Sequence, residues 1–216
     1  MLSTLMLVAP VQVVAQLQTY SIDGLELVEG PRNGQGMAVV YVRPGATLAP
    51  YKSVMLDPVE VAFDKSWMPR PSMSARDRER VRQELAEEFR IAFADELVKI
   101  GGYKIVQVAD ADVLRVTAAI VDLYVEAPGV GTSDWSKTYT VSASRMSLIA
   151  ELRDAESGAI LARVADRKVA SSPGRMPGGV LHWTTRAANR AEARRTLRSW
   201  AGLLRAALDS ARASAP

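Results

Sequence analysis

The stretch ELRDAESGAILARVADRK, residues 151–168, decides the fold because its pattern predicts two strands joined by a tight turn. Asp154, Ser157 and Gly158 supply the turn, since glycine tolerates a positive φ and aspartate bonds its own backbone. Apolar and charged residues alternate on either side of that turn. A period of two is typical of antiparallel strands that bury one face. The stretch therefore predicts a hairpin with one dry face and one charged face.

The alternation extends to both sides of this hairpin. Residues 113–126 and 138–154 carry the apolar sets Leu114, Val116, Ala118, Ile120 and Met146, Leu148, Ala150, Leu152. Residues 159–170 carry Ile160, Ala162 and Val164 opposite Arg163 and Arg167. Shorter strands are expected at 21–30, 37–42, 51–67 and 103–108. Pro58 has no amide hydrogen to donate, so it predicts a sheet edge or a bulge that shifts the apolar phase by one residue.

Two amphipathic helices complete the pattern. The first, residues 74–100, begins at Ser74 with Asp77 three residues on, as in a capping box, and ends at Gly101 and Gly102. Its apolar stripe contains Val81, Leu85, Phe89, Ala92, Phe93, Leu97 and Ile100. The second, about residues 184–211, has an apolar seam of Leu197, Trp200, Leu204, Leu208 and Ala211. We expect an α+β fold: one two-layer sandwich, with a mixed, mainly antiparallel sheet and both long helices packed on one face.

The amino-terminal stretch MLSTLMLVAPVQVVAQ, residues 1–16, has no charged side chain. It is too short for a membrane-spanning helix, which needs about 20 residues. The pattern favours a secretory signal over residues 1–15, with cleavage before Gln16, although no Lys or Arg precedes the apolar run. The alternative is a first buried strand. The expected organisation is a signal-like segment at 1–15 and a single domain at 16–216.

Composition excludes several kinds of chemistry. The chain of 216 residues contains no cysteine, which removes disulfides, thiol catalysis, thiolate zinc sites and iron–sulfur clusters. Asp110 and Asp112 do not fit a calcium loop, because Arg115 and Val121 stand where glycine and glutamate are needed. The glycine-rich stretch at residues 33–36 lacks a phosphate-binding context. We expect no cofactor, no metal and no catalytic residue.

The second helix carries the most distinctive surface feature. Its flank repeats arginine at steps of four or seven, at Arg186, Arg190, Arg194, Arg198, Arg205 and Arg212. From Arg175 onward the sequence has eight arginines against Glu192 and Asp209. Such a surface suits an acidic protein, an anionic envelope polymer or phospholipid headgroups; a solvated helix face is the plainer interpretation. Nucleic acid is not expected.

Aromatic residues near loop ends are further candidates for partner binding. Trp135 and Trp183 lie in or beside the long loops at residues 127–135 and 171–180. Exposed aromatics there could anchor a partner, or they could cover the core. The candidate partner-binding residues are therefore Arg186, Arg190, Arg194, Arg198, Trp135 and Trp183.

Three segments have a distinctive sequence: GLELV at 24–28, the stretch at 41–67, and the W-A-x-x-L-R-x-x-L-D pattern at 200–209. Together they resemble a domain-of-unknown-function family of bacterial envelope lipoproteins. The most specific part is Y-K-x-V-x-L-D-P-V at 51–59. The resemblance implies an exported protein of the periplasm or outer-membrane periphery, and it implies no known activity. Members of that family often carry a lipid-modified cysteine, and this sequence has none.

The sequence therefore predicts a non-catalytic envelope protein that binds a protein or an anionic partner, with no transmembrane helix in the mature chain. The alternative is a periplasmic enzyme that uses Asp57, Glu60 and His182, the only histidine. Paired carboxylates suit acid–base chemistry only where they converge on a cleft.

Overall fold

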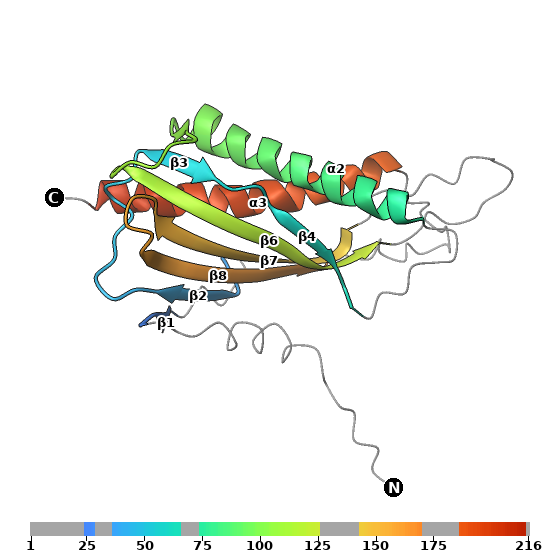
Figure 1. Cartoon of the computed structure of the whole chain (residues 1–216), viewed down its shortest axis with the longest axis horizontal. Coiled ribbons are helices and arrows are strands. Elements are labelled where there is room, and N and C mark those ends of the chain that lie inside the picture. The colour runs from blue at the N-terminus through green and yellow to red at the C-terminus, as the bar shows by residue number, and fades with distance from the viewer. Residues whose placement is uncertain (1–23, 29–35, 66–73, 126–142, 170–185, 215–216) are drawn as a thin grey trace, which may run out of the picture.

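The computed structural model describes residues 24–28, 36–65, 74–125, 143–169 and 186–214. The signal-like segment, Trp135, His182 and Trp183 lie outside the described residues. The predicted fold class is confirmed: one mixed sheet is covered on one face by two long helices (Figure 1).

The sheet contains eight strands in the described part of the chain. They are β1 (Glu26–Val28), β2 (Val39–Val42), β3 (Ser53–Leu56), β4 (Glu60–Phe63), β5 (Lys104–Ile105), β6 (Val113–Val125), β7 (Ala143–Asp154) and β8 (Ile160–Val169). Their order is β1-β2-β8-β7-β6-β3-β5, and β4 pairs with β6. From β1 to β6 all neighbours are antiparallel, whereas β3 and β4 run parallel to β6, and β5 runs parallel to β3.

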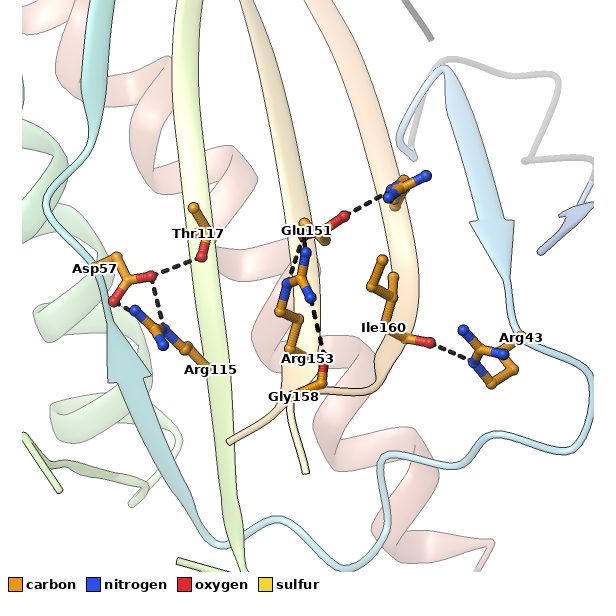
Figure 2. A network of polar contacts seen from close by, with 9 residues as sticks. Arg43, Asp57, Arg115, Thr117, Glu151, Arg153, Gly158 and Ile160 are labelled. Atoms are coloured by element: carbon orange, nitrogen blue, oxygen red, sulfur yellow. Dashed lines mark hydrogen bonds and ion pairs between the residues drawn. The ribbon is translucent and has the colours of Figure 1, made fainter. Parts of the chain in front are cut away.

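The long strands β6 and β7 bury the faces that the sequence predicts. The prediction for β8 was wrong at Ile160, because a register shift pairs Ile160 with Arg153 and places Leu161 in the core instead. Every apolar residue expected on the dry face of β6 and β7 is at most 7% exposed. The other face carries the polar residues Arg115, Thr117, Glu151 and Arg153, and Arg163 pairs with Glu151 on the same face. Figure 2 views this face, which we call the open face, and both helices lie behind the strands.

Ser147 is an exception on the open face, because it is fully buried. The register of β6 shifts between Val121 and Tyr124, and Asp122 within the shift has a φ of 55°. Aspartate tolerates this left-handed conformation better than most residues. The Asp122 carboxylate accepts a hydrogen bond of 3.1 Å from the Ser147 hydroxyl. The local bulge thus covers a position that simple alternation assigns to solvent.

The predicted bulge at Pro58 is confirmed. Leu56 of β3 faces Val116 and Glu60 of β4 faces Ala119, so the strand beside β6 holds one extra residue between these two pairs. Pro58 lies in the gap between β3 and β4, where no amide hydrogen is needed.

The first helix consists of α2 (Ala75–Ala94) and a terminal π-helical turn, η1 (Asp95–Ile100). The Ser74 hydroxyl accepts from the Asp77 amide and the Asp77 carboxylate accepts from the Ser74 amide, so the predicted capping box is present. The expected stripe is buried from Val81 to Leu97, but the prediction for Ile100 was wrong, because its side chain is 62% exposed. A π-helical turn contains more residues than an α-helical turn, so the 3.6-residue stripe does not continue through it.

The second helix is α3 (Arg186–Ala213). Leu197, Trp200, Leu204 and Leu208 of its predicted seam are buried, whereas Ala211 is only half-buried. Trp200 also ties α3 to the sheet. Its indole nitrogen donates a 2.7 Å hydrogen bond to Asp166 of β8, a carboxylate that is only 4% exposed. The Lys168 amine lies 3.0 Å from the same carboxylate. A charge inside the core is therefore compensated by two neighbours.

Candidate functional site

Two of the predicted partner-binding arginines hold the helices together. Glu88 of α2 is 4% exposed, and one of its carboxylate oxygens accepts a 2.7 Å hydrogen bond from Nε of Arg190. Arg194 binds both oxygens of the same carboxylate, at 2.5 and 2.9 Å. Both guanidinium groups remain about half exposed. The structure therefore gives Arg190 and Arg194 a packing role on one side and leaves them open to solvent on the other.

Hydrogen bonds from Arg194 and Arg190 hold the pKa of Glu88 below its ordinary value, although burial acts in the opposite direction. Sequence reasoning missed Glu88. The signal was its place seven residues after Val81, on the side of the helix that otherwise carries apolar residues.

Stability should therefore fall in acid partly through Glu88. Because its folded-state pKa is lowered, the ionised form stabilises the fold above about pH 4.5, and this contribution is lost as the pH falls through the lowered value. Between pH 7 and pH 3, the free energy of unfolding should fall less in Glu88→Gln than in the wild type. Urea titrations at several pH values measure this. Parallel curves for the two proteins would contradict the assignment.

The other arginines of α3 divide into two groups, and one of them, Arg195, was not part of the predicted flank. Arg195 pairs with Glu192 on its own helix and is 69% exposed, and Arg198 is exposed near Asp95. Further along α3, Arg205 binds Asp209 at 2.8 Å and lies 3.4 Å from Glu96 of η1. Arg186 begins α3, but its side chain lies outside the described residues.

The end of α3 and the turn η1 are joined by a second polar cluster. The Tyr103 hydroxyl donates a 2.8 Å hydrogen bond to Asp209, and the Arg212 guanidinium lies 4.0 Å from the centre of the Tyr103 ring. Burial and this carboxylate raise the pKa of Tyr103 to about 12. Arg205 thus packs α3 against η1, and Arg212 packs the end of α3 against Tyr103, just after η1.

We define the arginine surface as Arg190, Arg194, Arg195 and Arg198. These four guanidinium groups face three described carboxylates, Glu88, Glu192 and Asp95, and Asp95 also binds Lys99. The arginines of α2 are balanced differently, because Arg80, Arg82 and Arg90 each pair with an acid three or four residues away on the same helix. Positive charge is therefore in surplus on α3.

The carboxylates of the enzyme alternative have different surroundings. Asp57 accepts hydrogen bonds from Arg115 at 2.9 Å and from Thr117 at 2.6 Å (Figure 2). Burial would raise the pKa of Asp57, but hydrogen bonds from Arg115 and Thr117 outweigh burial and lower it. Glu60 is exposed at the start of β4. Asp57 is therefore an ionised acceptor that ties the bulge to β6.

The Tyr51–Val59 motif has a structural role at the sheet. Tyr51 is buried, and its hydroxyl donates a 2.9 Å hydrogen bond to Asp154 at the start of the β7–β8 turn. Burial, together with this carboxylate, raises the pKa of Tyr51 to about 12. Tyr51 thus connects the motif to the β7–β8 turn, and Asp57 connects it to β6.

On the open face, Glu151 accepts from Arg153 and from Arg163, both at 2.6 Å (Figure 2). Asp110 and Asp112 lie in the turn before β6, where the Asp110 carbonyl accepts from the amide of Val113. Within the described ranges, no group of three acids or histidines could hold a metal ion. The same ranges contain no helix long and apolar enough to cross a membrane.

Several solved structures are similar to this chain at low identity. A Caulobacter crescentus protein described as a lipoprotein is 14% identical, with 78% of this chain and 95% of that chain covered and a TM-score of 0.35. A Helicobacter pylori homologue of the neuraminyllactose-binding hemagglutinin is 13% identical, with 79% and 96% covered and a TM-score of 0.39. The PelC dodecamer from Paraburkholderia phytofirmans is 10% identical, with 84% and 96% covered and a TM-score of 0.31.

No curated protein matches the chain. The predicted resemblance to a family of unknown function is confirmed, whereas the role of residues 51–59 as its signature stays a prediction. Because residues 16–201 match the family DUF3313, described as a protein of unknown function, the chain belongs to that family.

Proposed function

We propose that the protein is a non-catalytic component of the bacterial cell envelope that binds an anionic partner through the arginine surface of α3. The observation that carries the proposal is the charge surplus on α3, where four guanidinium groups face three carboxylates, one of which also binds Lys99. Arg195 and Arg198 project into solvent. An anionic surface attracts such a cluster at long range, and the attraction becomes stronger when the charged groups come into contact.

The location in the envelope is supported by the uncharged apolar run at residues 1–15. Fractionation of cells that make the protein at its natural level should find it in the periplasm or with the outer membrane. Recovery in the cytoplasm would contradict the location, but the binding test that follows does not depend on this result.

The binding test uses vesicles, with and without phosphatidylglycerol, and an envelope extract passed over the immobilised protein. Arg195→Gln/Arg198→Gln removes two surface charges and leaves Glu88 with both partners. Because each arginine near an anionic surface contributes about 1 kcal/mol, the double variant should bind about 30-fold more weakly. Binding of the wild type should also weaken steeply as salt is added.

Arg80→Gln/Arg90→Gln is the matched control, since it removes the same charge from exposed positions of α2. The control should bind like the wild type. Equal losses in both double variants would show that net charge alone is sensed, and unchanged binding in Arg195→Gln/Arg198→Gln would exclude the arginine surface. Capture of an acidic protein in place of vesicle binding would identify a protein partner.

A further inference from the structure

A partly enclosed cavity of about 220 Å³ lies between the dry face of the sheet and α3. Strands β2, β8, β7 and β6 form its floor, and Trp200, Leu203, Leu204 and Ala207 form its roof. Apart from Thr47, every described residue that lines it is hydrophobic. The one indole nitrogen in the roof already donates to Asp166. The cavity therefore offers a ligand almost nothing but apolar contact.

Short side chains at the centre of the sheet create this space. Ala118, Ala150 and Ala162 lie on the dry face of three neighbouring strands, and Ala118 directly faces Ala150. Leucine and valine occupy most of the neighbouring positions on this face, so each alanine leaves a volume that α3 does not fill. Protein interiors are normally packed without such voids, and the atoms that line one lose dispersion contacts.

The mouth of the cavity lies between α3 and the loop that connects β2 to β3. Thr47 of this loop and Ala207 of α3 are exposed, and Met37 and Leu203, which also line the cavity, are half-buried. A ligand can therefore reach the cavity from solvent without unfolding the core. None of the four residues of the arginine surface lines it.

The lining selects the chemistry of the occupant. A sugar, nucleotide or amino acid would lose its hydrogen bonds to water and gain none. Water itself needs two or more polar partners, so an apolar cavity stays dry and accepts hydrocarbons. A cavity of about 150 Å³ accommodates the six carbons of benzene, so by proportion this cavity holds about nine carbons.

We infer that the cavity binds one unbranched hydrocarbon chain of about eight to ten carbon atoms, from a fatty acid or from an acyl chain of a lipid. This inference goes beyond the proposed function and does not depend on it, because the two sites share no residue. An uncharged ligand also separates the tests, since it cannot be attracted by the arginine surface.

The test is calorimetric titration with straight-chain fatty acids from hexanoate to tetradecanoate, and with decan-1-ol. Affinity should rise about fourfold for each added methylene group until about ten carbons, and then level off as further carbons stay outside. Decan-1-ol should bind about as tightly as decanoate. The titrations are run at two temperatures, because apolar burial near room temperature can release almost no heat. Absence of heat for every ligand at both temperatures, or affinities that do not level off with chain length, would overturn the inference.

Two variants locate the binding. Ala150→Leu fills the cavity and should weaken decan-1-ol binding about tenfold or more, while Ala119→Leu, one residue from Ala118 on the open face of β6, should bind like the wild type. Ala207→Trp closes the mouth from an exposed position and should also weaken binding, which keeps the test valid if Ala150→Leu does not fold. Wild-type affinity in Ala207→Trp and in folded Ala150→Leu would assign the ligand elsewhere.

The source of the chain is distinguished by a further pair of titrations. Decanoate represents free fatty acids, and dioctanoyl phosphatidylglycerol below its micelle concentration represents lipid acyl chains. Tighter binding of decanoate assigns the site to fatty acids, and tighter binding of the lipid assigns it to acyl chains. If neither binds the wild type more tightly than Ala150→Leu, the inference fails.

Discussion

Trp200→Ala is expected to lower the free energy of unfolding by about 3–5 kcal/mol, the usual cost of removing a large buried aromatic side chain. Trp200 is fully buried in the seam of α3, so no solvent replaces its contacts. The substitution also removes a hydrogen-bond donor from Asp166, which is 4% exposed and keeps only the Lys168 amine. Because domains are stable by about 5–15 kcal/mol, this loss is a large part of the total.

Urea denaturation followed by circular dichroism measures the effect, since helical ellipticity does not depend on the removed indole. Trp200→Phe is the informative companion, because it keeps a buried aromatic ring while it removes the N–H group and one ring of the indole. Its cost should be about 1–3 kcal/mol, the penalty for a buried acceptor that loses a donor. A loss below about 1 kcal/mol in Trp200→Ala would mean that α3 does not pack as described.

Arg190→Ala/Arg194→Ala should cost about 3–5 kcal/mol at neutral pH, because it leaves the Glu88 carboxylate buried without either cation. The two arginine side chains are half exposed, so their truncation by itself removes little buried surface. Burial without a partner raises the pKa of a carboxylate, so the cost should shrink as the pH falls and Glu88 becomes protonated.

A third substitution separates this mechanism from a general loss of helix contacts. Adding Glu88→Leu to the double variant replaces the stranded charge with an apolar side chain and should restore most of the lost stability. Arg80→Ala/Arg90→Ala, two exposed positions of α2, should change the stability by less than about 1 kcal/mol. A triple variant as unstable as the double variant would show that charge burial is not the cause.

Sequence patterns predicted the parts of the fold that local periodicity determines. The alternation assigned the dry face of β6 and β7 correctly but failed at Ile160 of β8, and Ser74 with Asp77 located the start of α2. The missing amide of Pro58 predicted the bulge because that property belongs to one residue and needs no partner.

What periodicity could not predict depends on partners far away in the chain. The ion pairs of Glu88 join residues more than 100 positions apart, so the arginine flank of α3 looked like a free surface. The exposure of Ile100 follows from a π-helical turn that no spacing in the sequence indicates. The cavity also escaped notice, because Ala118, Ala150 and Ala162 fit a buried strand face as well as larger residues do.

The place of β2 in the sheet has a consequence for biosynthesis. Val39–Val42 pairs with Ala162–Ala165, so this apolar strand emerges about 120 residues before its partner. At a translation rate of about 5–20 residues per second, the wait is roughly ten seconds. The hairpin of β7 and β8 has no such delay. An apolar strand edge that stays unpaired for that time promotes aggregation. We therefore expect a chaperone to bind the first strands of the nascent chain until β8 has been synthesised.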